Sequence, residues 1–169
     1  EDPYRLVSSA HGDLPSIDAL NIAPSIQVWG MNVYRWDQPE SIFEEWKAIS
    51  NKPMYFAELG ADSYMTKSTE KYTQGENQIA QANANKIILD QVLSNSDKNI
   101  GSFIFQFTDG LWKAGNPKKQ DTGGSAPNSD GTPYDGTANE EYWGIVDINR
   151  NKKITFDVVK DAYVNFDIK

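Results

Sequence analysis

The sequence predicts an α/β fold in which parallel strands are joined by crossover helices. Two observations support this prediction. Short segments rich in β-branched and aromatic residues alternate with longer amphipathic segments, and the short segments are almost continuously apolar, as in the strands of a buried parallel sheet. A chain of 169 residues can bury a core and is typical of one domain. We therefore expect a single domain over residues 1–169.

The predicted strands are short segments in which residues that favour extended backbone predominate. They cover residues 4–9, 26–34, 54–58 and 102–107. Because these segments are apolar along their whole length, we expect each strand to be buried on both faces.

The predicted helices lie between the strands and after the last one, over residues 16–23, 40–50, 76–93 and 154–164. In the second helix, Ile42, Phe43 and Trp46 recur at helical spacing. The segment 113–141 is rich in Gly, Pro and Asp, which predicts a long loop after the fourth strand.

The composition excludes several classes of function. Lys and Arg total 16 against 24 Asp and Glu, a net charge of −8, which argues against a nucleic-acid partner. The chain has one histidine and no cysteine, and Asp121, Asp130 and Asp135 lack the spacing of a calcium loop, so we expect no metal. No glycine-rich phosphate loop follows a predicted strand, so we expect no cofactor, and no apolar run approaches the roughly 20 residues that span a membrane.

Polar and aromatic side chains stand where the predicted strands end. In parallel α/β folds, functional residues gather beyond the carboxyl ends of the strands, so we expect these side chains on one face. They are His11, Asn32, Tyr34, Arg35, Trp36, Glu58, Gln106, Asp109 and Trp112.

Glu58 stands out among them because a carboxylate at the end of a buried strand is unfavourable unless it is paired or used. It could act chemically, cap a helix, or form a buried ion pair with Arg35 or a lysine. Tyr34 and Arg35 could both donate hydrogen bonds to it. Trp36 and Trp112 could be sugar platforms or ordinary packing residues.

Four segments together resemble the last part of the retaining β-glycosidases built on a (β/α)8 barrel, the clan A type. VWGMNVYR (28–35), KPMYFAELG (52–60) and GSFIFQFTD (101–109) resemble the sixth, seventh and eighth strands. NEEYWGIVD (139–147) resembles the segment after the eighth strand. The similarity covers residues 4–164 and includes β-1,3-glucanosyltransferase-like and β-galactosidase/β-glucuronidase-like barrels.

The resemblance implies a retaining mechanism, which uses two carboxylates about 5–5.5 Å apart. Glu58 would be the nucleophile, Tyr34 would orient it, and Trp112 would form the floor of a sugar subsite. We expect further substrate contacts from Asn32, Arg35, Trp36, His11, Gln106 and Asp109. The implied substrate is a β-linked polysaccharide, and the implied location is extracellular or at the cell surface.

The sequence departs from this family in one important respect. The family's acid/base glutamate ends the fourth strand in an Asn-Glu pair, whereas the first strand here corresponds to the fifth. The pair Asn139-Glu140 comes after the last strand. We therefore expect the C-terminal half of a TIM barrel, with strands 1–4 on a second chain or segment.

Two other interpretations remain. The chain could be a non-catalytic carbohydrate-binding or structural protein on a degenerate barrel scaffold. A small flavodoxin-like domain would need a phosphate loop after a strand, which the sequence does not contain.

Overall fold

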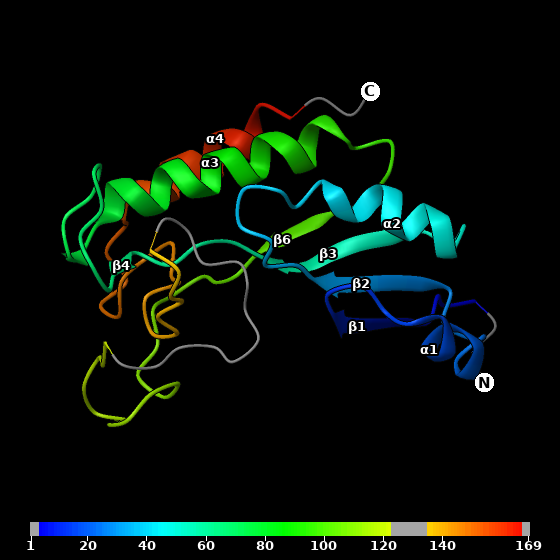
Figure 1. Cartoon of the computed structure of the whole chain (residues 1–169), viewed down its shortest axis with the longest axis horizontal. Coiled ribbons are helices and arrows are strands. Elements are labelled where there is room, and N and C mark those ends of the chain that lie inside the picture. The colour runs from blue at the N-terminus through cyan, green and yellow to red at the C-terminus, as the bar shows by residue number, and fades with distance from the viewer. Residues whose placement is uncertain (1–3, 123–134, 167–169) are drawn as a thin grey trace.

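The computed structural model describes residues 4–122 and 135–166. Its centre is a four-stranded parallel sheet in the order β1-β2-β3-β6 (Figure 1). The strands are β1 (Ser8–Gly12), β2 (Val28–Asn32), β3 (Met54–Leu59) and β6 (Ser102–Ile104). The predicted α/β class with parallel strands is therefore confirmed.

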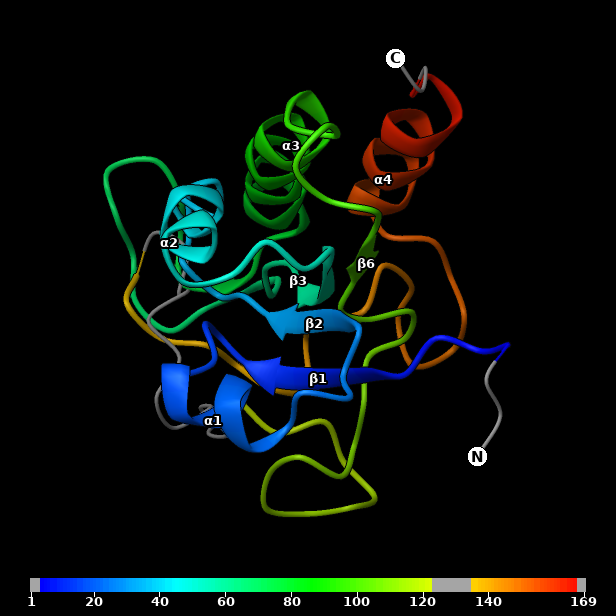
Figure 2. The same ribbon diagram turned by 90° about the vertical axis from the view of Figure 1, so that its right-hand side faces the viewer.

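All four predicted helices are present, each within two residues of its predicted bounds. They are α1 (Ile17–Ile22), α2 (Ser41–Ile49), α3 (Gln78–Ser94) and α4 (Ile154–Val164). Ser16 caps α1 by accepting a hydrogen bond from the Ala19 amide, and Asn77 caps α3 by accepting one from Ala80. Figure 2 shows α1 below β1, and α2, α3 and α4 following one another over the other side of the sheet.

The hydrophobic core lies between the sheet and these helices. Ile42, Phe43 and Trp46 form the buried face of α2, as their spacing predicts. Phe43 meets Phe56 of β3 edge to face, with ring centroids 5.5 Å apart. Because successive strand residues point to opposite faces, Phe56 and its alternate neighbours point to the helices, and Tyr55 lies on the other face.

The first strand was predicted wrongly at 4–9, because pairing with β2 fixes its position and begins at Ser8↔Val28. Tyr4 and Leu6, which made the segment look buried, are 94% and 71% exposed. The prediction that each strand is buried on both faces holds for most of β2. It holds only in part for β3, where buried and half-buried residues alternate, and it fails for the two edge strands. Along β1, exposed and half-buried residues alternate, and Phe103 of β6 is 62% exposed.

The last strand, predicted over 102–107, is also shorter than expected, since β6 ends at Ile104. The peptide bond between Phe105 and Gln106 is cis. A two-stranded antiparallel hairpin, β4 (Tyr64–Met65) with β5 (Gly75–Glu76), follows β3 and was not predicted. Its strands are too short to produce a recognisable alternation in the sequence.

The described parts of the predicted loop, residues 113–122 and 135–141, contain no helix or paired strand segment. Buried acidic side chains hold them by accepting backbone hydrogen bonds. Glu141 accepts from Ala114 and Asp121, and Asp135 accepts from Thr66 and Thr137. Asp130 lies outside the described residues. Across the described ranges, no helix is both long and apolar enough to cross a membrane.

Candidate active site

Glu58 and Tyr34 meet at the carboxyl ends of two adjacent strands. The pairing of β2 with β3 sets Asn32 opposite Glu58, and the Val33 amide donates to the Glu58 carbonyl over 2.8 Å. Two residues after Asn32, the Tyr34 hydroxyl donates a 2.8 Å hydrogen bond to Oε2 of Glu58. The strand register therefore places a phenol donor on the carboxylate that the sequence singles out.

Tyr34 stands in a cluster of three aromatic rings. Its ring meets Trp143 edge to face, with centroids 5.1 Å apart, and Phe105 with centroids 6.4 Å apart. Phe105 and Trp143 are in turn 6.0 Å apart. Phe105 and Trp143 were not predicted as site residues, although both lie within segments that carry the family resemblance.

Gly60 allows Phe105 to approach β3. Its φ is +151°, a conformation that side chains disfavour, and a Cβ there would lie 2.6 Å from the Phe105 carbonyl oxygen. The Phe105 amide donates to the Leu59 carbonyl over 2.8 Å. The glycine that follows Glu58 by two positions is therefore needed to bring the Phe105 backbone beside β3.

The Tyr34 phenol remains protonated over the ordinary pH range. Burial raises the pKa of Tyr34 far above its usual value, and the charge of Glu58, its hydrogen bond and the charge of Glu140 raise it further. Tyr34 is consequently a hydrogen-bond donor to Glu58 at any pH at which the protein is expected to work.

Glu140, which follows the last predicted strand and was not predicted as a site residue, also belongs to this neighbourhood. Its Oε2 lies 3.2 Å from the Lys113 ammonium. That ammonium is 5.5 Å from the centre of the Phe105 ring and 4.8 Å from that of Trp112. Lys113 and Glu140 therefore form an ion pair, called here the rim pair, beside the aromatic cluster.

Arg35 does not contact Glu58. Its guanidinium binds Asp13 through Nε over 2.9 Å and Nη2 over 2.5 Å, and it also binds Glu45. An ion pair between Glu58 and Arg35, which the sequence left open, is thus not formed. The Arg35 charge instead ties the loop after β1 to α2.

Asp109 is buried inside the fold and its oxygens are occupied. Oδ1 accepts from the Lys153 ammonium and from the Gly144 amide, both over 2.7 Å, and Oδ2 accepts from Gln120 over 3.1 Å. The Lys153 and Asp109 side chains are 1% and 2% exposed. This pair joins the segment after β6 to the start of α4, so the structure uses Asp109 as a buried ion-pair partner.

Asn32 and Gln106 lie at the ends of β2 and β6 with hydrogen-bonding capacity unused. Oδ1 of Asn32 and Nε2 of Gln106 are buried and have no hydrogen-bond partner among the described residues. A buried acceptor and a buried donor of this kind are unfavourable unless a ligand or another segment satisfies them. Their substrate contacts stay predictions, as do those of His11, whose Nδ1 lies 3.0 Å from the Gly12 carbonyl, and Trp112, which is 71% exposed.

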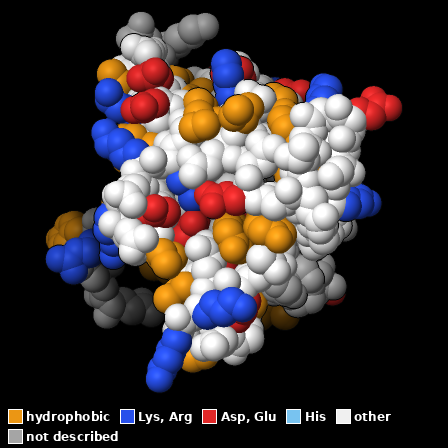
Figure 3. All heavy atoms as spheres, turned by 90° about the vertical axis from the view of Figure 1, so that its left-hand side faces the viewer, with side chains coloured by type: hydrophobic (Ala, Val, Ile, Leu, Met, Phe, Trp, Pro, Cys, Tyr) orange, Lys and Arg blue, Asp and Glu red, His pale blue; other side chains and the backbone are white. Residues whose placement is uncertain are grey.

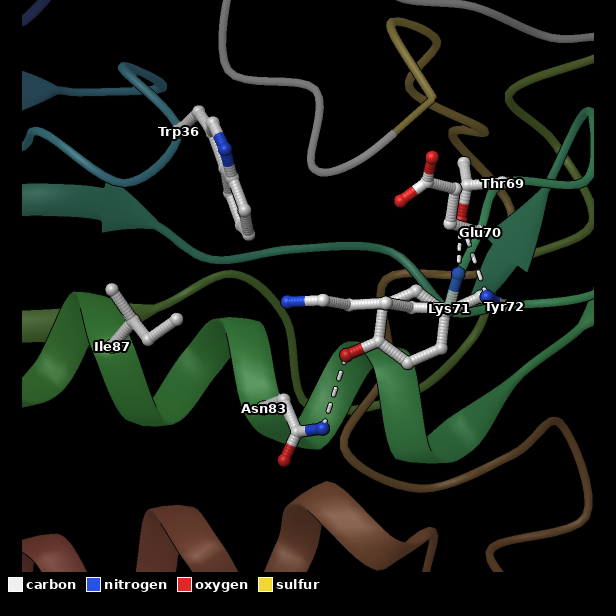
Figure 4. Close-up of a pocket in the computed structure, with 7 residues that line it drawn as sticks. All are labelled: Trp36, Thr69, Glu70, Lys71, Tyr72, Asn83 and Ile87. Atoms are coloured by element: carbon white, nitrogen blue, oxygen red, sulfur yellow. Dashed lines mark hydrogen bonds between the residues drawn. The ribbon is translucent and has the colours of Figure 1, made fainter.

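Trp36 lies apart from the aromatic cluster, in a cavity of about 380 Å³ between the loop after β2, the loop joining β4 to β5, and α3 (Figure 4). Tyr72 on this loop accepts a 3.1 Å hydrogen bond from Asn83 of α3. None of the residues lining the cavity belongs to the Glu58–Tyr34 neighbourhood.

Figure 3 shows the face toward which the strands point, where acidic side chains gather near the middle beside hydrophobic ones. A carboxylate held by a phenol next to aromatic rings suits the binding and cleavage of a sugar, because sugars present both polar edges and apolar faces. Within the described residues, no group of three or more His, Cys, Asp or Glu could hold a metal ion.

The fold is one that glycoside hydrolases use. A GH2 β-galacturonidase from Eisenbergiella tayi, solved with galacturonate bound, superposes with a TM-score of 0.66 and 24% identity over 98% of this chain. A β-D-glucuronidase from Dictyoglomus thermophilum gives 0.64 and 18% over 98%. A GH113 β-1,4-mannanase gives a TM-score of 0.57 and 15% identity over 94%.

These likenesses establish the fold, because the sequence identities are low. The chain spans 28% of the β-galacturonidase, 27% of the β-glucuronidase and 45% of the mannanase. No protein-family model and no curated protein sequence matches the chain.

Proposed function

We propose that this chain supplies the nucleophile half of a retaining β-glycosidase, with Glu58 as the nucleophile. The observation that carries the proposal is the 2.8 Å hydrogen bond from Tyr34 to Glu58 at adjacent parallel strand ends. The structural likeness to β-glycosidases supports it, as does the aromatic cluster around Tyr34.

In this mechanism a Glu58 oxygen attacks the anomeric carbon and forms a glycosyl–enzyme ester, while a second carboxylic acid protonates the departing oxygen. The same second group then takes a proton from water, which attacks the anomeric carbon and releases Glu58. A sugar hydroxyl in place of water would give transglycosylation. Tyr34 orients Glu58 throughout, and the half-buried Phe105 offers apolar ring surface to the sugar, with the buried Trp143 packed against it.

We further propose that the acid/base group comes from barrel strands 1–4, carried by a second chain or a further segment. Within residues 4–122 and 135–166, β1 and β6 each pair with one strand of the sheet, which leaves an edge on each that a further strand could pair with. On the face opposite the helices, Tyr55 packs against Phe103, whose side chain is largely exposed. Closing a barrel would cover both the edges and this face.

Activity measurements on matched variants test the proposed nucleophile. With aryl β-glycosides as substrates, we expect Glu58→Gln to lower kcat by several powers of ten, as loss of covalent catalysis does. Glu44→Gln, on the exposed side of α2 with a side chain 72% exposed, is the matched control. If the unchanged protein, assayed with any partner that co-purifies, binds sugars and turns none over, the non-catalytic carbohydrate-binding alternative replaces the proposal.

Mass measurements on the native and the denatured protein test the proposal that a second chain or segment supplies strands 1–4 of the barrel. A particle that contains a further chain or segment with a glutamate or aspartate at a strand end supports the proposal. A fully active particle made only of this chain contradicts the missing-half proposal.

A further inference from the structure

We infer that the rim pair, Lys113 with Glu140, makes this site select neutral β-glycosides over glycosides of uronic acids. The inference rests on the function proposed above and concerns the same site. It would separate this protein from the β-galacturonidase and β-glucuronidase that share its fold.

The rim pair is connected to the nucleophile through the aromatic cluster. Tyr34 donates to Glu58, the Tyr34 and Phe105 ring centroids are 6.4 Å apart, and Lys113 lies over the Phe105 ring. The charge of Glu140 also acts on the Tyr34 hydroxyl directly. A sugar held against Tyr34 and Phe105 would therefore lie within reach of both charges of the pair.

Three cations that the structure describes in this part of the fold are already paired with carboxylates. Lys113 pairs with Glu140, Arg35 binds Asp13 and Glu45, and Lys153 binds Asp109. A uronate carboxylate needs a cation to replace its lost hydration, because burying a charge without a partner is strongly unfavourable. Here it would meet the carboxylates of Glu58 and Glu140 instead, so the described residues disfavour it.

A neutral sugar suits the same groups. Each sugar hydroxyl can donate one hydrogen bond and accept others, so it can satisfy an ammonium and a carboxylate together. Oε2 of Glu140 is buried beside the Lys113 ammonium and accepts no hydrogen bond from the described residues, so it has acceptor capacity that a ligand hydroxyl could satisfy on displacing the lysine. The Lys113 and Glu140 side chains are 28% and 15% exposed, so solvent screens their charges only in part.

Calorimetric binding of two inhibitors that differ only in charge tests this selectivity. The pair is deoxynojirimycin and its uronic analogue, because neither is turned over and their shared ring nitrogen cancels in the ratio of dissociation constants. We expect the protein, with any partner that co-purifies, to bind the neutral inhibitor at least about tenfold more tightly. Glu140→Gln removes the repulsion and frees Lys113, so it should shift the ratio at least about tenfold toward the uronic inhibitor.

Two further variants control for charge changes elsewhere. Lys113→Gln should shift the ratio further toward the neutral inhibitor, whereas Lys119→Gln, on the same loop with a side chain 73% exposed, should leave it unchanged. Tighter binding of the uronic inhibitor by the unchanged protein overturns the inference, as does an unaltered ratio in Glu140→Gln or binding of neither compound.

The outcome of this selectivity test can be distinguished from the outcome of the test of the proposed function. If Glu58→Gln abolishes turnover and Glu140→Gln leaves the ratio of dissociation constants unaltered, the role of Glu58 as nucleophile is supported and the inferred selectivity is wrong. If Glu140→Gln shifts the ratio and the protein turns over no glycoside, the rim pair is supported as part of a selective binding site and the proposed enzymatic function is contradicted.

Discussion

The hydroxyl of Tyr34 lies 2.8 Å from Oε2 of Glu58 and donates to it across the ends of two adjacent parallel strands. Such a bond to an ionised carboxylate is among the stronger hydrogen bonds in proteins. It fixes the direction in which Glu58 points, which matters because a nucleophile must be aligned with the bond that it attacks.

Removing the Tyr34 hydroxyl should therefore impair catalysis more than folding. We expect Tyr34→Phe to lower kcat/KM about 10- to 100-fold, the range for loss of a hydrogen bond to a charged group. Steady-state kinetics with an aryl β-glycoside measures this change. Tyr72→Phe, in the separate cavity that contains Trp36, is the control and should change kcat/KM less than about twofold. Equal effects of the two variants would contradict the orienting role.

The buried pair of Lys153 and Asp109 should be a large contributor to stability. We expect Lys153→Met to lower the free energy of unfolding by about 3–5 kcal/mol, because Asp109 is left buried without its partner. The double variant with Asp109→Asn should lose less than the sum of the two single losses. Urea denaturation gives these values, and Lys160→Met, at an exposed position of α4, is the control. Additive losses would show that the two charges do not interact.

Asp62 should make the protein less stable as the pH rises. Burial raises the pKa of Asp62 from 3.8 to about 8, with the nearby Asp135 charge adding to the shift and Lys153 opposing it. The folded state thus keeps a proton that the unfolded state releases above pH 4. The stabilisation from this proton is complete below pH 4 and decreases as the pH rises toward 8, by at most about 1.4 kcal/mol per pH unit.

Asp62→Asn should remove this dependence. Urea denaturation at pH 5 and pH 8 is expected to show the variant gaining stability relative to the unchanged protein at the higher pH. A constant difference between the two proteins across this range would mean that Asp62 does not hold the extra proton.

Gly60 should be required for activity although it touches no substrate. We expect Gly60→Ala to reduce kcat/KM at least about tenfold, because the new Cβ would press on the Phe105 carbonyl and displace that ring. Gly12→Ala, at the end of β1 with no atom within 4 Å of the added Cβ, is the control. If both variants keep full activity, the close approach of Phe105 to β3 is not needed for catalysis.

Much of the fold could be predicted because the spacing of apolar residues along a short segment indicates whether that segment forms a helix or a strand. The stripe of Ile42, Phe43 and Trp46 predicts α2 and its buried face, and the apolar run from Met54 predicts β3. The limits of β1 could not be predicted, because hydrogen bonding with β2 fixes them and no local pattern reports a partner strand. The edge exposure of Phe103 has the same cause, since hydrophobicity does not show which strand lies at an edge.

The candidate site could be predicted only in part, because some of its residues are placed by local position in a strand and others by contacts between distant segments. Position at a strand end was enough to select Glu58 and Tyr34. Phe105, Trp143 and Glu140 enter the site through tertiary contacts, and their positions depend on the chain returning after β6 to pair Thr108 with Val146. Asp109 looked like a site residue because it follows a strand, but Lys153, 44 positions later, turns it into an interior ion pair.

Covalent trapping of the glycosyl–enzyme tests the central claim most directly. The protein, with any partner that co-purifies, is incubated with an activated 2-deoxy-2-fluoro-β-glycoside, digested, and its peptides are weighed and sequenced by mass spectrometry. We predict one labelled peptide, with the fluorosugar esterified to Glu58 and the label absent in Glu58→Gln. A label on another carboxylate, or turnover of β-glycosides without any label on Glu58, would contradict its role as the nucleophile.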